Sequence, residues 1–271
     1  MLYCSREERG QCVVQFDTWC DADDTPVAPH HVRTLTVRQA DLPVGVNRTA
    51  QIVPTHYASE ERIARAYARL AKPQAAALVT ELLPQTPQMR SGDLGEIYAT
   101  EWINAHSGYR APINRLRWKD HRHMAMRGDD VIGIFQDPAS QRLSFLKTES
   151  KSRINLTAGV VQEARNGLDK DGGLPSPHAL SFVSSRLLDL NLDLALVDAI
   201  DDAQRVHGIP AHSVRHLLFT FSGNAPGGLL RQSFQAYGGA ITQWGVGLHV
   251  QSHAAFIGTV YGQVIANANN A

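Results

Sequence analysis

The sequence has few cysteines, no net charge and no long apolar run. Its 271 residues include three cysteines, all within the first twenty positions and without a Cys-x-x-Cys pair. That arrangement argues against a disulfide framework and against a zinc ribbon. No stretch approaches the roughly 18 consecutive apolar residues of a membrane-spanning helix, and the beginning, MLYCSREERG, lacks the apolar segment of a signal peptide. We therefore expect a soluble, cytoplasmic, globular protein that does not enter a membrane.

Two common catalytic signatures are also missing. The sequence has no Gly-x-Ser-x-Gly elbow of a serine hydrolase, and its paired glycines lie in no phosphate-loop pattern. His121 and His123 could begin a metal site, but no third ligand follows at a spacing typical of zinc. A basic surface is the better interpretation of these histidines.

The charge is balanced overall but not along the chain. The 26 basic and 26 acidic side chains cancel, which excludes a long disordered polyelectrolyte. Residues 84–153 hold 11 basic and 8 acidic side chains, and within them 114–127 reads NRLRWKDHRHMAMR. A basic run with an interleaved aromatic residue is typical of a surface that follows nucleic-acid phosphates, although a solvated loop has the same composition. The candidates for binding nucleic acid are Arg115, Arg117, Lys119, Arg122 and Arg127.

The first 90 residues are expected to form a smaller N-terminal α+β region. Residues 1–57 combine β-rich segments with scattered prolines, which predicts short strands and loops. Ser59 precedes two glutamates and has the pattern of a helix N-cap, and a second helix is expected over 73–83. The stretch PQTPQMRSG that follows is the best boundary. It divides the chain into an accessory or docking region, 1–90, and a larger domain, 91–271.

The larger domain alternates helical and strand patterns. A helix is expected over 92–106, and two strands, 131–135 and 143–149, are joined by the turn DPASQ. Further segments predict helices over 157–168 and 181–206, a buried strand over 216–221, one or two more strands within 247–261, and a frayed tail. This order indicates an α/β layered domain.

Charged residues lie at adjoining ends of the two expected strands. Asp130 begins the first strand, and Glu149 and Lys151 end the second and point to the same face. If the strands form a hairpin, Asp130 and Glu149 become cross-strand neighbours. Two carboxylates held this close repel each other unless a positive charge lies between them, and Mg²⁺ with oxygen ligands meets that need. Lys151 would then lie where it can position an attacking water.

This order of motifs resembles the PD-(D/E)xK nuclease superfamily over roughly residues 92–162. The resemblance implies a restriction-endonuclease-like mixed sheet flanked by helices, and a DNA nuclease that uses Mg²⁺, with Mn²⁺ as a substitute. It implies that Asp130 and Glu149 are metal ligands, together with the main-chain carbonyl of Ser150. Lys151 would be the base that orients the water, and Glu96, on the preceding helix, an outer or second-metal carboxylate.

The match leaves three assignments open. No proline precedes the first acidic residue, so Asp129 competes with Asp130, and we favour Asp130 because Gly-x-Asp is a common variant. Glu101 competes with Glu96 because it falls on the apolar stripe of the same helix. Gln162 stands where some members of the superfamily place a glutamine that contacts the substrate, although a plain surface glutamine fits the sequence equally well.

A narrower resemblance concerns the HamA family, the nuclease subunit of Hachiman anti-phage defence systems, which acts beside a helicase. It rests on a variable N-terminal region, the Gly-Glu helix, the motifs GDD and ESKSR, and a later His-x-Leu-Phe strand at 216–219. Other two-gene nuclease–helicase systems fit equally well. The resemblance implies DNA as substrate and a helicase or ATPase as partner. A non-catalytic subunit of the same fold and a stand-alone restriction endonuclease remain alternatives, the latter without a visible target-recognition element.

Overall fold

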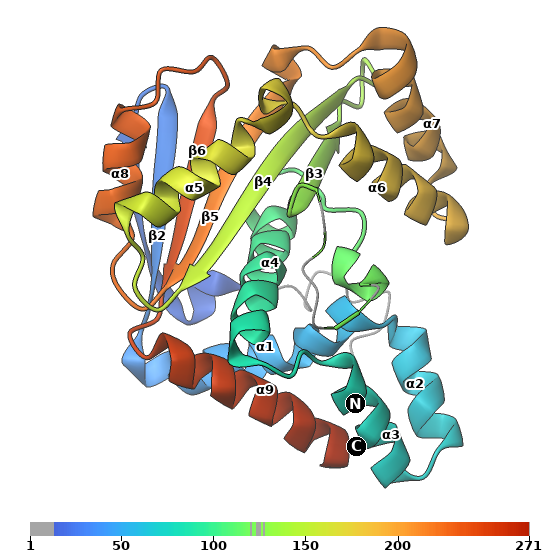
Figure 1. The fold of residues 1–271 in the computed structure, drawn as a ribbon. Coiled ribbons are helices and arrows are strands. Elements are labelled where there is room, and N and C mark those ends of the chain that lie inside the picture. The colour runs from blue at the N-terminus through green and yellow to red at the C-terminus, as the bar shows by residue number, and fades with distance from the viewer. Residues whose placement is uncertain (1–13, 120, 123–125, 127, 271) are drawn as a thin grey trace.

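The computed structural model describes residues 14–119, 121, 122, 126 and 128–270. Its strands are β1 (Cys20–Val27), β2 (His30–Val37), β3 (Val131–Gln136), β4 (Leu143–Arg153), β5 (Val214–Ser222) and β6 (Gln243–His249). They form a six-stranded sheet in the order β1-β2-β6-β5-β4-β3 (Figure 1). The four inner strands are parallel, while β1 and β3 run antiparallel to their neighbours at the two edges. The sheet is therefore mixed, as expected.

Helices flank this sheet. They are α1 (Leu42–Tyr57), α2 (Glu60–Arg69), α3 (Lys72–Leu82), α4 (Pro87–His106), α5 (Ala158–Leu168), α6 (Pro177–Asp189), α7 (Leu194–Asp202), α8 (Gly227–Gln235) and α9 (His253–Asn270). Serine or threonine side chains cap α2, α4, α5 and α6 by accepting a hydrogen bond from a backbone N–H of the first turn. The cap at Ser59 is the one that the sequence predicted, and α2 begins directly after it. In contrast, α4 begins at Pro87 rather than near residue 92, within the segment expected to be a boundary.

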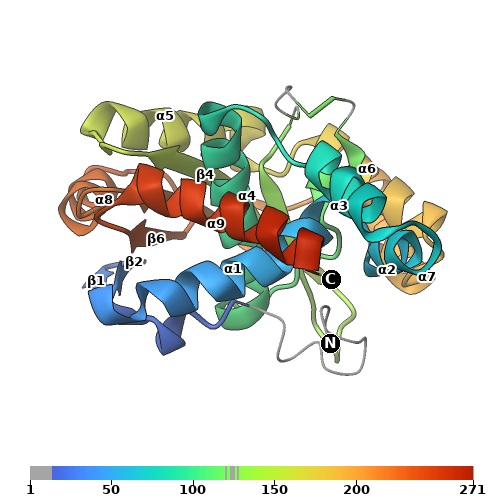
Figure 2. The same ribbon diagram turned by 90° about the horizontal axis from the view of Figure 1, so that it is seen from below.

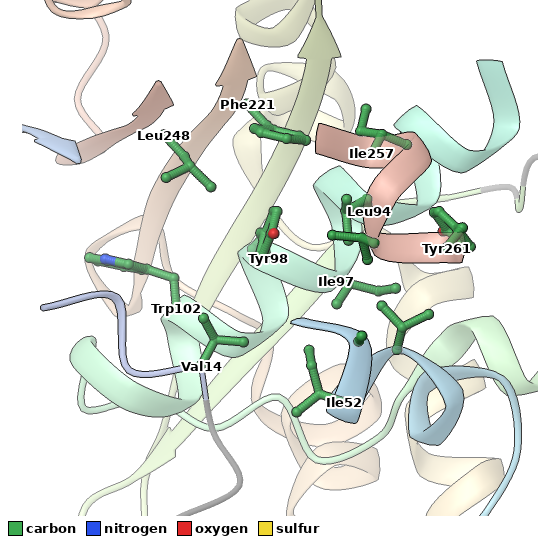
Figure 3. Close-up of a cluster of buried hydrophobic side chains, with 14 of the residues drawn as sticks. Val14, Ile52, Leu94, Ile97, Tyr98, Trp102, Phe221, Leu248, Ile257 and Tyr261 are labelled. Atoms are coloured by element: carbon green, nitrogen blue, oxygen red, sulfur yellow. The ribbon is translucent and has the colours of Figure 1, made fainter. Parts of the chain in front are cut away.

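One face of the sheet packs against α1, α4 and α9, and α3 joins their core. Figure 2 shows α9 crossing over α4 beside α1, and both helices contact it. Ile52 of α1, Tyr98 of α4, Phe221 of β5 and Tyr261 of α9 belong to one buried cluster (Figure 3). Burial of aromatic side chains of this size supplies much of the hydrophobic stabilisation.

The opposite face carries two smaller cores. Along β5, Leu217 and Phe219 join the large cluster, whereas Leu218 between them packs against α5 and α8. This alternation follows from the two-residue period of a strand. At the β3 edge, Ile132 and Ile134 pack against α6 and α7. Both faces are covered, which explains the nearly continuous apolar sequence of β5.

The region expected to contain only strands and loops also holds a helix. Residues 20–27 and 30–37 form strands, but 42–57 is α1 rather than a loop. Pro43 lies in the first turn, where its missing N–H costs nothing, and Pro54 lies in the last turn. Prolines at helix ends therefore imitated the composition of a loop.

Two further segments differ from expectation. The single helix expected over 181–206 is divided into α6 and α7, because Asn191 and Asp193 adopt positive φ angles of 52° and 44° between them. The expected strands within 247–261 are confined to the end of β6, since α9 starts at His253 and continues through the expected frayed tail to Asn270.

The expected division at residues 90 and 91 falls inside α4. β1 and β2 belong to the same sheet as β3–β6, and the large core contains Ile52 and Val79 as well as Phe219 and Val260. Residues 14–90 and 91–270 thus share one sheet and one core. Among the described residues, no helix is long and apolar enough to cross a membrane.

Candidate active site

The β3–β4 hairpin brings the two acidic positions of the motif together. Val131 pairs with Thr148, so Asp130 directly precedes one partner and Glu149 directly follows the other. The Oδ2 atom of Asp130 accepts a hydrogen bond of 2.8 Å from the backbone N–H of Ser150. This bond holds the Asp130 carboxyl group against β4 beyond the last pair of the ladder. The arrangement is the one expected from the hairpin pattern.

Glu149 and Lys151 lie side by side on β4. The Nζ atom of Lys151 is 2.6 Å from Oε1 of Glu149, and both side chains retain about a fifth of their exposure, at 20% and 18%. They face α5, where Gly167 lies so close that a Cβ atom there would be 2.6 Å from Cδ of Glu149. The glycine leaves the space that the Glu149 carboxylate occupies. The lysine therefore reaches solvent beside a carboxylate whose position is restricted.

Ser150 points to the opposite face of the sheet. Its Oγ atom would lie 3.0 Å from a Cβ atom at Gly95 of α4. The N–H and C=O of one residue point to the same edge of a strand, and the Ser150 N–H points to Asp130. The main-chain carbonyl of Ser150 is therefore directed to the edge where the Asp130 carboxyl group lies. β3 ends its ladder before this position.

Helix α4 adds Glu96 to this edge. Its Oε2 atom is 3.9 Å from Nε of Arg115, and no hydrogen bond from the described part of the chain reaches it. Arg115 also donates hydrogen bonds to the backbone carbonyls of Asp129 and Asp130, the latter at 2.8 Å. Arg115 thus lies between the helix and the start of β3.

The carboxyl groups of the site resist ionisation. Burial, opposed by Arg115 and reinforced by Asp130, raises the pKa of Glu96 to about 8. Burial also raises the pKa of Asp130, against the Ser150 N–H and Arg115, which favour the charged form. The pKa of Glu149 is raised by burial and by Asp130, although Lys151 opposes both effects. Burial and mutual repulsion of this kind favour either a proton or a cation among the carboxylates.

The oxygen atoms present suit a hard divalent cation. Asp130, Glu149 and the carbonyl of Ser150 would hold it at the end of the hairpin, and Mg²⁺ commonly takes few protein ligands and keeps several waters. Burial raises the pKa of both carboxyl groups, so a positive charge beside them would stabilise their ionised forms. No group of three or more His, Cys, Asp or Glu side chains in the described residues is arranged to hold a metal. Glu96 is therefore placed as a neighbour of Asp130 rather than as a third ligand.

The competing acidic residues have other partners. Asp129 accepts a hydrogen bond of 2.8 Å from the Ser176 N–H and lies 3.5 Å from Nζ of Lys147. Glu101 accepts hydrogen bonds from His56, at 2.8 Å, and from the Val14 N–H, at 3.2 Å. Both pairs of alternatives left open by the sequence therefore have different surroundings, and the structure brings Asp130 and Glu96 toward the motif.

The basic run does not form an open strip. Arg117 donates to the carbonyl of Thr55 at 2.8 Å, Arg122 donates to the carbonyl of Glu81 at 2.8 Å, and Lys119 is 2.5 Å from Asp93. These contacts turn the three side chains toward α1, α3 and α4. Of the four described candidates, Arg115 is the one that bonds to the backbone of Asp130, whereas Lys119 lies near Glu96 and is held by Asp93. Arg127 and His123 lie outside the described residues.

Gln162, the remaining candidate for contact with nucleic acid, makes a local side-chain contact. It is exposed on α5 and donates to Oδ1 of Asn166 at 2.9 Å, one turn along the same helix. Its contact is that of an ordinary surface glutamine.

Sequence reasoning missed a buried polar group beside the site. The Asp93 carboxylate accepts a hydrogen bond of 2.8 Å from the Tyr57 hydroxyl and pairs with Lys119. The Tyr57 hydroxyl also meets that of Tyr261, at 3.1 Å. Asp93 precedes Glu96 by one helical turn, which was a usable signal, but its partners come from α1, α9 and the segment before β3. The group fixes α4, and with it Glu96, to three distant parts of the chain.

Comparisons with known proteins identify the family of this chain. The family model described as HamA matches residues 14–264, which include both edge strands and the β3–β4 hairpin. A curated relative, the Hachiman protein HamA of Bacillus cereus, is 31% identical over 123 residues. That segment spans 45% of this chain and 42% of the relative, so the chain covers less than half of the relative's length. Because the family model matches nearly the whole sequence, the chain belongs to the HamA family.

Proposed function

We propose that this HamA family member is a metal-dependent DNA nuclease of the PD-(D/E)xK type and the effector of a Hachiman-type anti-phage system. The observation that supports a nuclease is the partly buried pair of carboxyl groups, Asp130 and Glu149, at the end of one hairpin, with the Lys151 ammonium 2.6 Å from Glu149. The Hachiman role rests on the family and on the name of the relative.

The side chains have separable tasks in this proposal. Mg²⁺ or Mn²⁺, when bound by Asp130, Glu149 and the Ser150 carbonyl, would supply positive charge to the phosphate and acidify a water. Lys151, held by Glu149, would orient that water for attack on phosphorus and, as the neutral amine, would accept the proton that the water loses. Arg115 would add positive charge beside Asp130, where the phosphate must approach.

A partner protein would account for the small number of basic side chains available to DNA. All four described basic candidates make internal contacts. Residues 84–153 carry an excess of only three positive charges, 11 basic against 8 acidic. Phosphate contacts supply most non-specific DNA affinity, so this chain alone should bind DNA weakly. We infer that a helicase partner delivers the DNA. The same observation favours the second candidate function, a non-catalytic subunit that binds the helicase.

The decisive assay is cleavage of plasmid and linear DNA in Mg²⁺ or Mn²⁺, with and without a genomically adjacent helicase. Glu149→Gln and Lys151→Met should abolish cleavage while the protein remains folded. Two matched controls are available on exposed positions: Glu163→Gln of α5 and Lys72→Met of α3 should cleave like the wild type.

Three other results would redirect the proposal. Full cleavage by Lys151→Met would remove the assigned site. DNA binding without cleavage in every combination would favour the non-catalytic subunit. Discrete fragments instead of a smear would favour a stand-alone restriction endonuclease.

A further inference from the structure

A cavity of about 420 Å³ opens beside the acidic site. Trp118, Phe182 and Val183 contribute to an apolar wall, and Arg115 and Asp130 contribute to a charged one. The volume lies in the range of about 300–1,000 Å³ that small organic groups occupy in proteins. The cleavage chemistry needs the charged wall only, so the apolar wall has no role in it.

The rings of Trp118 and Phe182 are nearly perpendicular and form a corner, and Arg186 lies against both of them. The ring centroids of Trp118 and Phe182 are 6.1 Å apart at an interplanar angle of 89°. The guanidinium of Arg186 lies 5.9 Å from the first centroid and 5.6 Å from the second, and Asp189 holds Arg186 at 2.7 Å. Both rings remain partly exposed. A flat ring could therefore stack on one of them while its edge meets the other.

We propose that this cavity takes one unstacked nucleobase of the strand on which the neighbouring carboxylates act, an inference that rests on the proposed nuclease function. A base has two apolar faces and a polar rim, and it is attached to an anionic phosphate. An aromatic corner opposed by an arginine matches these properties. Asp130 belongs both to the cavity and to the acidic site, so the base would come from a nucleotide next to the phosphate that is cut.

The geometry also selects the form of the nucleic acid. A base can enter a side cavity only after it leaves the helical stack, which costs least in a single strand. A single strand or a locally opened duplex is therefore the preferred substrate. A simple apolar ligand would have no use for Arg115 and Asp130, and a phosphate alone would have no use for Trp118 and Phe182.

The test is equilibrium binding of the full chain to two fluorescent strands of equal length, in EDTA so that no cleavage occurs. One strand is oligothymidylate and the other carries abasic spacers throughout. The wild type should bind the first about tenfold more tightly. In Phe182→Leu and Trp118→Leu this ratio should fall toward one, whereas Phe135→Leu, the same change at a ring on the far end of β3, should preserve it. Thermal melting of each variant confirms folding, and Phe182→Met is the substitute if leucine is not tolerated.

Equal binding of the two strands by the wild type, or an unchanged ratio in both cavity variants, would overturn the inference. Displacement of the strand by thymidine monophosphate at the strand's own affinity would make the cavity a mononucleotide site and would also overturn it. The readout is independent of cleavage. A protein that never cuts DNA but shows the ratio defeats the nuclease proposal alone, and a protein that cuts but shows no ratio defeats the cavity assignment alone.

Discussion

Asp129 and Lys147 form a buried ion pair, with Oδ1 3.5 Å from Nζ. Lys147 is 1% exposed and also donates to the backbone carbonyls of Lys170 and Leu174, at 2.7 and 2.9 Å. The other Asp129 oxygen holds the N–H of Ser176, directly before α6. Asp129 therefore ties β4 to the segments around α6, whereas the adjacent Asp130 belongs to the acidic site.

Substitutions of Asp129 and Asp130 should have opposite effects on stability and cleavage. Asp129→Asn should lower the free energy of unfolding by about 3 kcal/mol, because the buried Lys147 charge loses its counter-ion. Asp130→Asn should leave stability unchanged or raised, because it removes repulsion from Glu149, and it should abolish cleavage. Urea unfolding and DNA cleavage measure the two effects. Exchanged results would assign Asp129 to the site instead.

A single methyl group should disturb Glu149. In Gly167→Ala the new Cβ atom would come within 2.6 Å of the Glu149 Oε2 atom, so the carboxylate must rotate away. We expect cleavage to fall at least about tenfold while stability stays within about 1 kcal/mol, since alanine favours a helix. Gly159→Ala on the same helix is the control, because its Cβ would meet only Thr157 Oγ1 at 3.7 Å. Equal activity of the two variants would show that the position of Glu149 does not matter for cleavage.

Substitutions of the two α4 glutamates should also differ in their effects on stability and cleavage. Glu101→Gln should destabilise the protein by about 1 kcal/mol, because the charge-assisted bond from His56 becomes a neutral one. Glu96→Gln should spare stability and reduce cleavage, because Glu96 lies beside Arg115 and influences Asp130. Chemical unfolding combined with cleavage rates distinguishes them. Loss of cleavage without loss of stability in Glu101→Gln would reverse the assignment.

His253 should make stability depend on pH. Burial lowers its pKa to about 4 in the folded protein, whereas an unfolded histidine has a value of about 6.5. Between these values the unfolded chain binds the extra proton, so the free energy of unfolding rises with pH. The contribution of His253 to this free energy is lost as pH falls from 6.5 to 4. One such group contributes up to roughly 1.4 kcal/mol per pH unit.

His253→Gln should flatten this dependence while keeping a donor for Ser152, which lies 3.0 Å from the His253 ring. Urea unfolding of both proteins at intervals from pH 4 to 7 measures it. Parallel curves for the two proteins would show that His253 titrates normally. Exposed His212 gives the control, since His212→Gln should follow the wild type.

The sequence predicted the parts of the site that depend on neighbouring residues. Alternation of apolar residues and the DPASQ turn predicted the β3–β4 hairpin, and the structure confirms it. Once the hairpin forms, its register places Asp130 near Glu149 and Lys151. The role of these residues in cleavage stays a prediction.

Contacts between residues far apart in the sequence could not be predicted from the local sequence pattern. Nothing local indicated that β2 would pair with β6, or that Lys119 would turn to Asp93 rather than to a phosphate. The prolines of α1 and the positive φ angles of Asn191 and Asp193 misled the assignment of elements, because composition does not reveal where in a helix a proline lies or which asparagine interrupts one.

The sequence by itself determined the hairpin and the order of its charged residues, because strand periodicity and turn chemistry act over a few residues. Only the tertiary structure shows that Asp129 and Asp130, and likewise Glu96 and Glu101, have different surroundings. Each difference depends on a partner far along the chain, such as Ser176 for Asp129 or His56 for Glu101. A buried carboxylate must find a donor or a cation, and only the folded chain shows which of them lies beside it.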